Sequence, residues 1–208
     1  MESNKSERPF IVGMIGHAKA GKDTCASFLQ TELCNQNLVN HQFQVSLAYG
    51  LKSMAMNLGF TVDEVYRPEC KEVYNEIFGM TPRKAMQTIG TMFRENFGKD
   101  IWLKYLENYV CTQHRKDSIV FVPDIRFPNE AIYIRDRFDC FLIKVERPSL
   151  DLSLPMYQHE SEIYVDSIKN YDAVVMNDSD LESFKNKSLE YMPSIVEAFK
   201  NHLQPNEG

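Results

Sequence analysis

Short apolar runs alternate along the chain with longer stretches in which apolar residues recur at helical spacing. Such runs predict buried strands, and their alternation with helices is typical of parallel βαβ units. The third and fourth runs are apolar without interruption, as expected of strands covered on both faces. The strands predicted in this way are residues 10–15, 43–48, 118–122, 140–145 and 172–176. We therefore predict an α/β fold with a doubly wound, parallel, five-stranded sheet that gathers ligands at the carboxyl ends of its strands.

The interval between the second and third predicted strands is about seventy residues, which is far more than one crossover helix needs. We interpret about residues 49–117 as an inserted helical segment, with helices at 69–78 and 82–97. A single helix is predicted over residues 181–203, where the apolar spacing indicates packing on the sheet. Residues 1–9 and 204–208 are expected to be loose tails, which leaves residues 10–203 as a single domain.

A glycine-containing loop follows the first predicted strand directly. Residues 16–24 read GHAKAGKDT, and a helical stretch comes next. Gly16 and Gly21 let the backbone curl so that successive N–H groups point at a polyphosphate, and the helix adds its positive N-terminal end. Lys22 would then reach the outer phosphates as a mobile point charge. Strand, loop and helix in this order favour a nucleoside triphosphate site over a simple glycine turn.

The residue after this lysine departs from the common pattern. Most such loops carry Ser or Thr there to bind Mg²⁺, whereas this chain has Asp23, with a hydroxyl one place later at Thr24. A carboxylate beside a triphosphate is repelled unless a cation lies between them. Our hypothesis is that Asp23 faces Mg²⁺, directly or through water, and that Thr24 contacts an inner phosphate.

Composition restricts the class of protein. The 208 residues are 43% hydrophobic, which is enough for a full core, and the formal charge of −6 argues against a nucleic-acid or anionic-membrane surface. Anionic substrates must therefore be bound by local clusters of Lys and Arg. The five cysteines show no metal-binding spacing, and neither a leader nor a membrane-spanning stretch is evident. We expect reduced thiols and a cytoplasmic protein.

The segment 82–97 begins with a strong helix-start signal, Thr81 as N-cap and Pro82 at the first helical position. One face of this helix is apolar, and the other presents two arginines around a glycine that permits close approach. Guanidinium groups suit phosphate oxygens because two parallel hydrogen bonds fit the anion. The face can therefore hold a second anionic substrate, and the alternative is a solvated amphipathic face. Its members are Arg83, Gln87, Gly90 and Arg94.

Two further segments follow strands on the same side of the predicted sheet. Asp124 and Arg126 come where the third strand is predicted to end, so the acid could orient Mg²⁺ or the attacking oxygen and the arginine could bridge two phosphates. A local salt bridge that shapes the turn is the competing interpretation. After the fourth strand, about residues 147–165 could form a lid that carries Arg147 over the triphosphate and excludes water. An ordinary surface loop is the alternative.

Taken together, these segments resemble one family, the bacteriophage deoxynucleoside monophosphate kinases of the P-loop superfamily. The likeness covers most of the chain and makes the GKDT string a family trait. The matching segments, in order, are residues 16–24, 47–52, 82–91 with Trp102 downstream, 122–126 with Glu130, 145–148, 159–162 and 174–178.

The resemblance implies Mg²⁺-dependent and ATP-dependent phosphorylation of deoxynucleoside monophosphates to diphosphates. By position, it implies one set of residues on the side of the acceptor and another on the side of the donor. The acceptor-side set is Lys52, Arg83, Gln87, Arg94, Trp102, Arg126 and Glu130. The donor-side set is Gly16, Lys19, Gly21, Lys22, Asp23, Thr24, Arg147 and Asn177. Lys22, Arg83, Asp124 and Arg126 are the expected catalytic residues, and Asp23 and Asp124 the expected metal ligands.

Two other functions stay open at this point. Phosphomevalonate kinase shares the GKD loop and a similar later half, although its acceptor segment differs from residues 83–91. A nucleotide-dependent switch is the alternative from another class, but it would not need a cationic face for a second small anion. Family likeness also makes a homodimer a reasonable expectation. For a viral chain, the expected location is the host cytoplasm.

Overall fold

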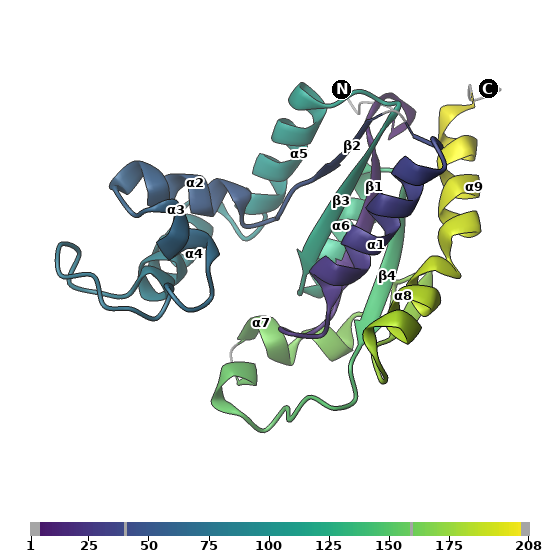
Figure 1. The fold of residues 1–208 in the computed structure, drawn as a ribbon. Helices are drawn as coiled ribbons and strands as arrows, with labels where there is room; N and C mark the ends of the chain where they lie inside the picture. The colour runs from purple at the N-terminus through teal and green to yellow at the C-terminus, as the bar shows by residue number, and fades with distance from the viewer. Residues whose placement is uncertain (1–4, 40, 159, 205–208) are drawn as a thin grey trace. The chain divides into compact units, whose positions relative to one another are not determined.

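The fold is described from a computed structural model, which describes residues 5–39, 41–158 and 160–204. Within these ranges, five parallel strands form one sheet in the order β2-β3-β1-β4-β5 (Figure 1). The strands are β1 (Phe10–Ile15), β2 (His41–Gln44), β3 (Ser118–Ile125), β4 (Cys140–Glu146) and β5 (Ala173–Met176). This topology confirms the predicted doubly wound, parallel, five-stranded sheet.

The second strand lies earlier in the chain than residues 43–48, where the sequence pattern predicted it. β2 pairs with β3 from His41 opposite Ser118 to Gln44 opposite Phe121. It is an edge strand and mostly exposed, so its polar side chains are tolerated and do not read as an apolar run. β3 is longer than predicted and continues to Ile125, which places Asp124 inside the strand.

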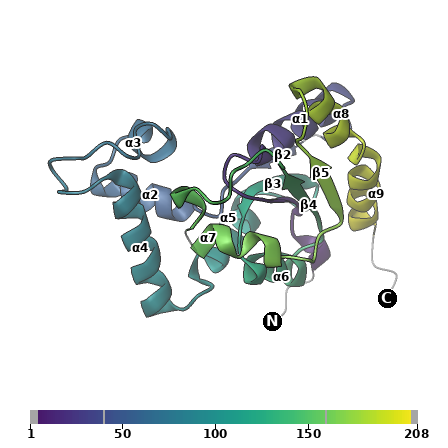
Figure 2. The ribbon, with the colours of Figure 1, turned by 90° about the horizontal axis from the view of Figure 1, so that it is seen from below.

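Helices cover both faces of the sheet. α1 (Lys22–Asn35), α8 (Leu181–Leu189) and α9 (Met192–Leu203) lie on one face, and α6 (Pro128–Arg137) lies on the other (Figure 2). The first face packs Val12 and Met14 of β1 against Leu29 of α1, Phe184 of α8 and Phe199 of α9. These side chains are at most 5% exposed, so β1, the central strand that leads into the glycine loop, is anchored in an apolar core.

Residues 181–203 form two helices and not the single helix that we predicted. α8 ends at Leu189, and α9 begins at Met192 with Pro193 in its first turn. Proline has no N–H to donate to the carbonyl of Leu189, and its ring clashes with that carbonyl, so the first helix cannot continue. The same residue is well suited to starting the second helix.

The described part of the expected N-terminal tail, residues 5–9, is packed and not loose. It contains a short 3-10 turn, η1 (Lys5–Glu7). Lys5 Nζ donates to the carbonyl of Arg135 at 2.6 Å, and the Arg8 guanidinium donates to the carbonyl of Arg137 at 3.1 Å. Both acceptors belong to the last turn of α6, where the helix dipole attracts cations. Residues 1–4 and most of the expected C-terminal tail, 205–208, lie outside the described residues.

Two compact units divide the chain. The first comprises residues 1–46 and 110–208, as far as they are described, and contains the sheet. The second, residues 47–109, covers most of the insertion predicted at about 49–117. It contains α2 (Tyr49–Leu58), α3 (Val62–Tyr66), α4 (Pro82–Phe97) and most of α5 (Ile101–Gln113). Ala55, Phe60, Val65 and Ala85 form a separate core there.

In the second unit, one predicted helix is confirmed and another is wrong. α4 begins and ends where predicted, and the Thr81 hydroxyl accepts the N–H of Lys84 as its cap. Residues 69–78 form turns and not a helix. The Asn75 side chain accepts the N–H groups of Ile77 and Phe78, and Gly79 has φ +64°. An asparagine that bonds its own following backbone competes with helix formation, which is why this segment folds back on itself.

Between β4 and β5 the first unit contains short helical turns. They are η2 (Pro155–Tyr157), α7 (Glu160–Ile163) and η3 (Val165–Ser167). Position 159, which belongs to one of the segments matching the family, lies outside the described residues. None of the helices in the described ranges is both long and apolar enough to cross a membrane.

Candidate active site

The loop between β1 and α1 adopts a backbone that requires its glycines. Gly16 has φ +154°, and a Cβ at this position would lie 2.5 Å from the carbonyl oxygen of Val145. Gly21 has φ +106°, and a Cβ there would lie 2.8 Å from the side-chain nitrogen of Asn177. A side chain at either place would therefore collide with the neighbouring strand or with a polar residue that lines the site.

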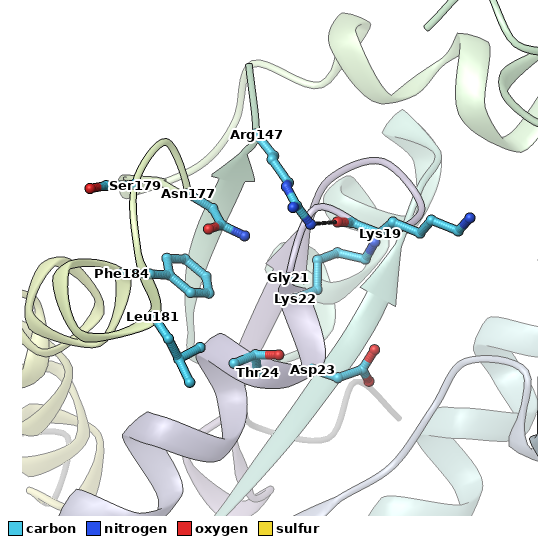
Figure 3. Close-up of a pocket in the computed structure, with 10 residues that line it drawn as sticks. All are labelled: Lys19, Gly21, Lys22, Asp23, Thr24, Arg147, Asn177, Ser179, Leu181 and Phe184. Atoms are coloured by element: carbon cyan, nitrogen blue, oxygen red, sulfur yellow. Dashed lines mark hydrogen bonds between the residues drawn. The ribbon is translucent and has the colours of Figure 1, made fainter. Parts of the chain in front are cut away.

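A cavity of about 550 Å³ opens beside this loop. Seven predicted donor-side residues line it together: Lys19, Gly21, Lys22, Asp23, Thr24, Arg147 and Asn177 (Figure 3). Ser179, Leu181 and Phe184 complete the lining, and sequence reasoning did not assign them to a site. Charged groups thus meet an apolar patch in one cavity, which is the mixture that a phosphate-bearing ligand with a planar base requires.

Lys22 is buried at the base of the loop. Its side chain is 6% exposed, and Nζ donates to the carbonyl of His17 at 2.6 Å. The pKa of this amine is lowered to about 8, chiefly by burial and then by the positive charge of Arg126, while the negative charges of Glu162, Asp23 and Asp124 act in the opposite direction. A phosphate that brings negative charge to this place would restore full protonation of the amine.

Side chains from the ends of β4 and β5 hold the loop from outside. Arg147 donates to the carbonyl of Lys19 at 3.2 Å (Figure 3), and Asn177 donates to the carbonyl of Ala20 at 2.9 Å. Lys19 itself has φ +62°, an uncommon value for a residue with a side chain. These bonds tie down carbonyls of the loop and thereby help to keep its N–H groups oriented.

The predicted metal ligands fit a metal that arrives with a nucleotide. Asp23 is exposed in the cavity, and Asp124 accepts the hydroxyl of Ser46. The negative charges of both carboxylates raise the pKa of Lys22, so both carboxylates lie near this lysine. In the described ranges no three His, Cys, Asp or Glu side chains are grouped to hold a metal by themselves. Mg²⁺ commonly uses one or two carboxylates together with substrate phosphates and water, and Asp23 and Asp124 are carboxylates of that kind.

Arg126 and Glu130 follow β3 and have defined partners in the first unit. The Arg126 guanidinium forms an ion pair with Glu162, which is 2% exposed. Glu130 Oε2 accepts the backbone N–H groups of Arg126 at 2.8 Å and of Phe127 at 3.1 Å. Glu130 therefore caps the start of α6, a role that is different from the acceptor contact implied by its position.

The remaining acceptor-side candidates lie in the second unit. Arg83, Gln87 and Arg94 are exposed on α4, and Arg83 is paired with Glu72. Lys52 of α2 lies 4.7 Å from the ring centre of Tyr66. The polar face of α4 is thus present as predicted, except at its glycine.

Gly90 and Trp102 are buried, so neither offers an open surface. The Trp102 indole is 8% exposed and donates to the carbonyl of Gly90 at 3.3 Å. A Cβ on Gly90 would contact Leu51 of α2 at 3.6 Å. A Cβ at this distance would make only ordinary contact, so Gly90 faces Leu51 without requiring a glycine, where we had expected the close approach of a ligand. Trp102 packs within the second unit and supports α4, whereas its position in the family implied a contact with the acceptor.

Comparisons with known proteins decide the family. The model of a family described as deoxynucleotide monophosphate kinase matches residues 38–188, well over half of the chain. A protein of Acanthamoeba polyphaga mimivirus named "Putative deoxynucleotide monophosphate kinase" is 31% identical over 188 residues, which are 84% of this chain and 91% of that protein. The chain belongs to the deoxynucleotide monophosphate kinase family. This confirms the resemblance stated above and makes the protein a nucleotide kinase and a phosphotransferase.

Solved structures of other kinases are less similar in sequence to this chain than the mimivirus protein is. The APS kinase of Mycobacterium tuberculosis, in complex with AMPPNP and APS, has a TM-score of 0.49 at 13% identity, over 92% of this chain and 99% of that chain. The shikimate kinase of Acinetobacter baumannii, in complex with shikimate, has a TM-score of 0.42 at 14% identity, over 95% and 96%. The fold assignment therefore rests on the order and direction of the strands.

Some residues of this kinase's site gave no usable signal in the sequence. Glu162 and Tyr157 lie in a polar, proline-interrupted stretch, which reads as a surface loop, yet they are 2% and 4% exposed. Leu181 and Phe184 were assigned to helix packing, because an apolar residue at helical spacing does not reveal whether it also lines a cavity. Only the match of residues 159–162 to the family pointed at Glu162.

Proposed function

We propose that this kinase transfers the terminal phosphoryl group of ATP to the phosphate of a deoxynucleoside monophosphate, giving ADP and a deoxynucleoside diphosphate. The observation that carries the proposal is the cavity beside the phosphate loop, in a chain of the deoxynucleotide monophosphate kinase family. Lys22, Arg147 and Asn177 line this cavity together with Leu181 and Phe184. The charged end suits a triphosphate and the apolar end suits the planar base of a nucleotide.

On the donor side, loop N–H groups and the start of α1 bind the phosphates, and Lys22 neutralises charge on the outer ones. Arg147 provides a guanidinium at the mouth of the cavity. Asp23 and Asp124 would hold the Mg²⁺ that arrives with the nucleotide, which would supply positive charge against the repulsion between the phosphates, and Thr24 contacts an inner phosphate.

On the acceptor side, Arg83, Gln87 and Arg94 of α4 and Lys52 of α2 bind the monophosphate. An acceptor phosphate is already a competent nucleophile near neutral pH, so no strong general base is required. Phosphoryl transfer asks the protein for alignment and charge compensation. Arg126, which shares the surroundings of Lys22, compensates the charge that develops on the transferred group.

The decisive experiment supplies purified protein with ATP and Mg²⁺ and varies the acceptor. One arm contains the four common deoxynucleoside monophosphates, a second phosphomevalonate, and a third no acceptor. ADP and the phosphorylated product are quantified by chromatography. We expect ADP to form rapidly only with one or more of the deoxynucleotides. Rapid ADP formation only with phosphomevalonate, or slow hydrolysis that no acceptor accelerates, would contradict the proposal.

A further inference from the structure

One buried carboxylate near the phosphate loop has no part in the proposed chemistry. Glu162 lies on the short helix α7, and its side chain is 2% exposed. An ionised carboxylate loses a large hydration energy on burial, so it is retained only where partners replace water. The identity of these partners indicates what the residue does.

The two oxygens of Glu162 have different partners. Oε1 pairs with the Arg126 guanidinium, and Oε2 accepts the backbone N–H of Ala18, in the phosphate loop, at 2.8 Å. Nδ1 of His17 lies 3.3 Å from the same Oε2. One carboxylate therefore joins the arginine that follows β3 to the loop that follows β1, across elements that are far apart in the sequence.

A second side chain from the same stretch strengthens this connection. The hydroxyl of Tyr157 donates to the carbonyl of Ala18 at 3.2 Å, so both polar backbone groups of Ala18 are bound from residues 157–162. The carbonyl of the preceding residue, His17, accepts Lys22 Nζ. The turn that Glu162 and Tyr157 hold is thus the turn that positions Lys22.

We propose that Glu162 is a positioning residue for phosphoryl transfer, which fixes the Arg126 guanidinium beside the phosphate loop and does not itself contact phosphate. The inference rests on the proposed function. A guanidinium has five N–H donors, so one bond to Glu162 leaves others for phosphate oxygens. An arginine that is already oriented loses less conformational freedom when the transferred group arrives, and misplacement of such a group slows the reaction strongly.

A different role for the same contacts makes the opposite prediction. If the Glu162 carboxylate occupied the place of a phosphate, nucleotide binding would have to displace it. Removing its charge would then tighten nucleotide binding and leave the maximal rate unchanged or higher. A positioning residue requires the reverse, a lower rate with little change in nucleotide affinity.

The test compares wild type, Glu162→Gln, Arg126→Ala and the double variant. Glu162→Gln keeps the size of the side chain and removes the charge that holds Arg126. We expect kcat with the deoxynucleotide acceptor to fall about tenfold to a hundredfold. The dissociation constant of a non-hydrolysable ATP analogue should stay within about threefold of wild type, because Lys22 and the loop are retained. In the Arg126→Ala background, Glu162→Gln should lower kcat no further, since residues that act through one another are not additive.

Controls separate this inference from damage to the fold and from failure of the proposed function. Glu160→Gln, an exposed change on the same short helix, should leave kcat unaltered. Glu162→Asp keeps the charge on a shorter side chain and should retain more activity than Glu162→Gln, which a loss of folding would not reproduce. Additive losses in the double variant, or tighter analogue binding with undiminished kcat, would overturn the positioning role. A wild-type protein that phosphorylates no deoxynucleotide would overturn the proposed function and this inference with it.

Discussion

The first unit, with the phosphate loop, and helix α4 of the second unit each present cationic residues, and the surroundings of these residues differ strongly. In the first unit, Lys22 is 6% exposed and hydrogen-bonded to the loop, and Arg126 is paired with a carboxylate that is 2% exposed. In the second unit, the side chains of Arg83 and Glu72 are 49% and 60% exposed, although they too form an ion pair.

This contrast has a physical consequence for binding. Groups held by buried partners are preorganised, so little conformational entropy is lost when a ligand binds. An exposed ion pair contributes little stability and its members can change partners readily. The lysine proposed for the donor side is therefore held by buried partners in the first unit, whereas the α4 arginines proposed for the acceptor side can be reoriented by a molecule that binds them.

The largest effect is expected from Lys22, the most deeply buried cation of the donor side. Lys22→Met preserves the length of the side chain and removes its charge, and we expect kcat/KM to fall about a thousandfold, as for the loss of a main electrostatic contact in the transition state. The coupled assay for ADP measures this. Lys185→Met, an exposed change on α8, is the control that should remain near wild type. Comparable activity of the two variants would remove the donor-site assignment.

The next effect tests the exposed side of the comparison. Arg83→Ala should lower kcat/KM for the deoxynucleotide about thirtyfold or more, because a charged contact to the acceptor is lost. Its melting temperature should change by less than about 1 °C, since exposed ion pairs contribute little. Arg67→Ala provides a matched control, because Arg67 forms an exposed ion pair with Asp63 in the same unit. Equal activity of both variants would show that α4 presents only a solvated face.

A third prediction concerns the cost of burying Lys22 in the ligand-free protein. The folded pKa of about 8 lies below the unfolded value of 10.5, so the unfolded chain binds more protons between these pH values. Stability from this group is therefore fully present above pH 10.5 and is lost as the pH falls through 8, with a slope of up to about 1.4 kcal/mol per pH unit. Urea unfolding gives the free energy of unfolding of wild type and of Lys22→Met at several pH values. As the pH rises, the two plots of this free energy against pH should converge or cross. Parallel plots would contradict the burial penalty.

The smallest expected effect lies in the scaffold of the second unit. Thr81→Ala removes the side-chain cap of α4 and should destabilise that helix by about 1 kcal/mol. Faster hydrogen exchange of the α4 amides, with unchanged exchange in β1 and β4, would locate the effect in the second unit. Thr88→Ala, exposed in the middle of the same helix, is the control and should not accelerate exchange. Acceleration in the sheet as well would show that the two units do not open independently.

Much of this fold could be predicted from the sequence, because neighbouring residues determine many of its helices and strands. The limits of α4 followed from Thr81 and Pro82, and the sheet followed from uninterrupted apolar runs. The errors arose where nonlocal partners decide. β2 is an exposed edge strand whose polar residues resemble a loop, and residues 5–9 are ordered by carbonyls at the end of α6. The pairing of β2 with β3, and of residues 5–9 with the end of α6, cannot be recognised from residues that are neighbours in the sequence.

The candidate site shows the same division. The glycine loop and its lysine are contiguous, so their spacing alone predicted a phosphate site, and Arg147 and Asn177 were placed on the donor side by family likeness. The cavity brings these residues together with Leu181 and Phe184, which had been interpreted as packing residues only. The role of Gly90 was misjudged, because a glycine on a polar helix face does not reveal whether a ligand or another helix approaches it.

The sequence by itself determined the loop, the parallel sheet and the family of this protein, because each depends on residues that are contiguous or regularly spaced. Only the tertiary structure decided that Glu162 is buried against Ala18 and Arg126, that Glu130 caps a helix, and that Trp102 supports α4. Burial and pairing depend on which distant segments meet, and the free energy of a charged or polar side chain is set by those neighbours and not by its position in the chain.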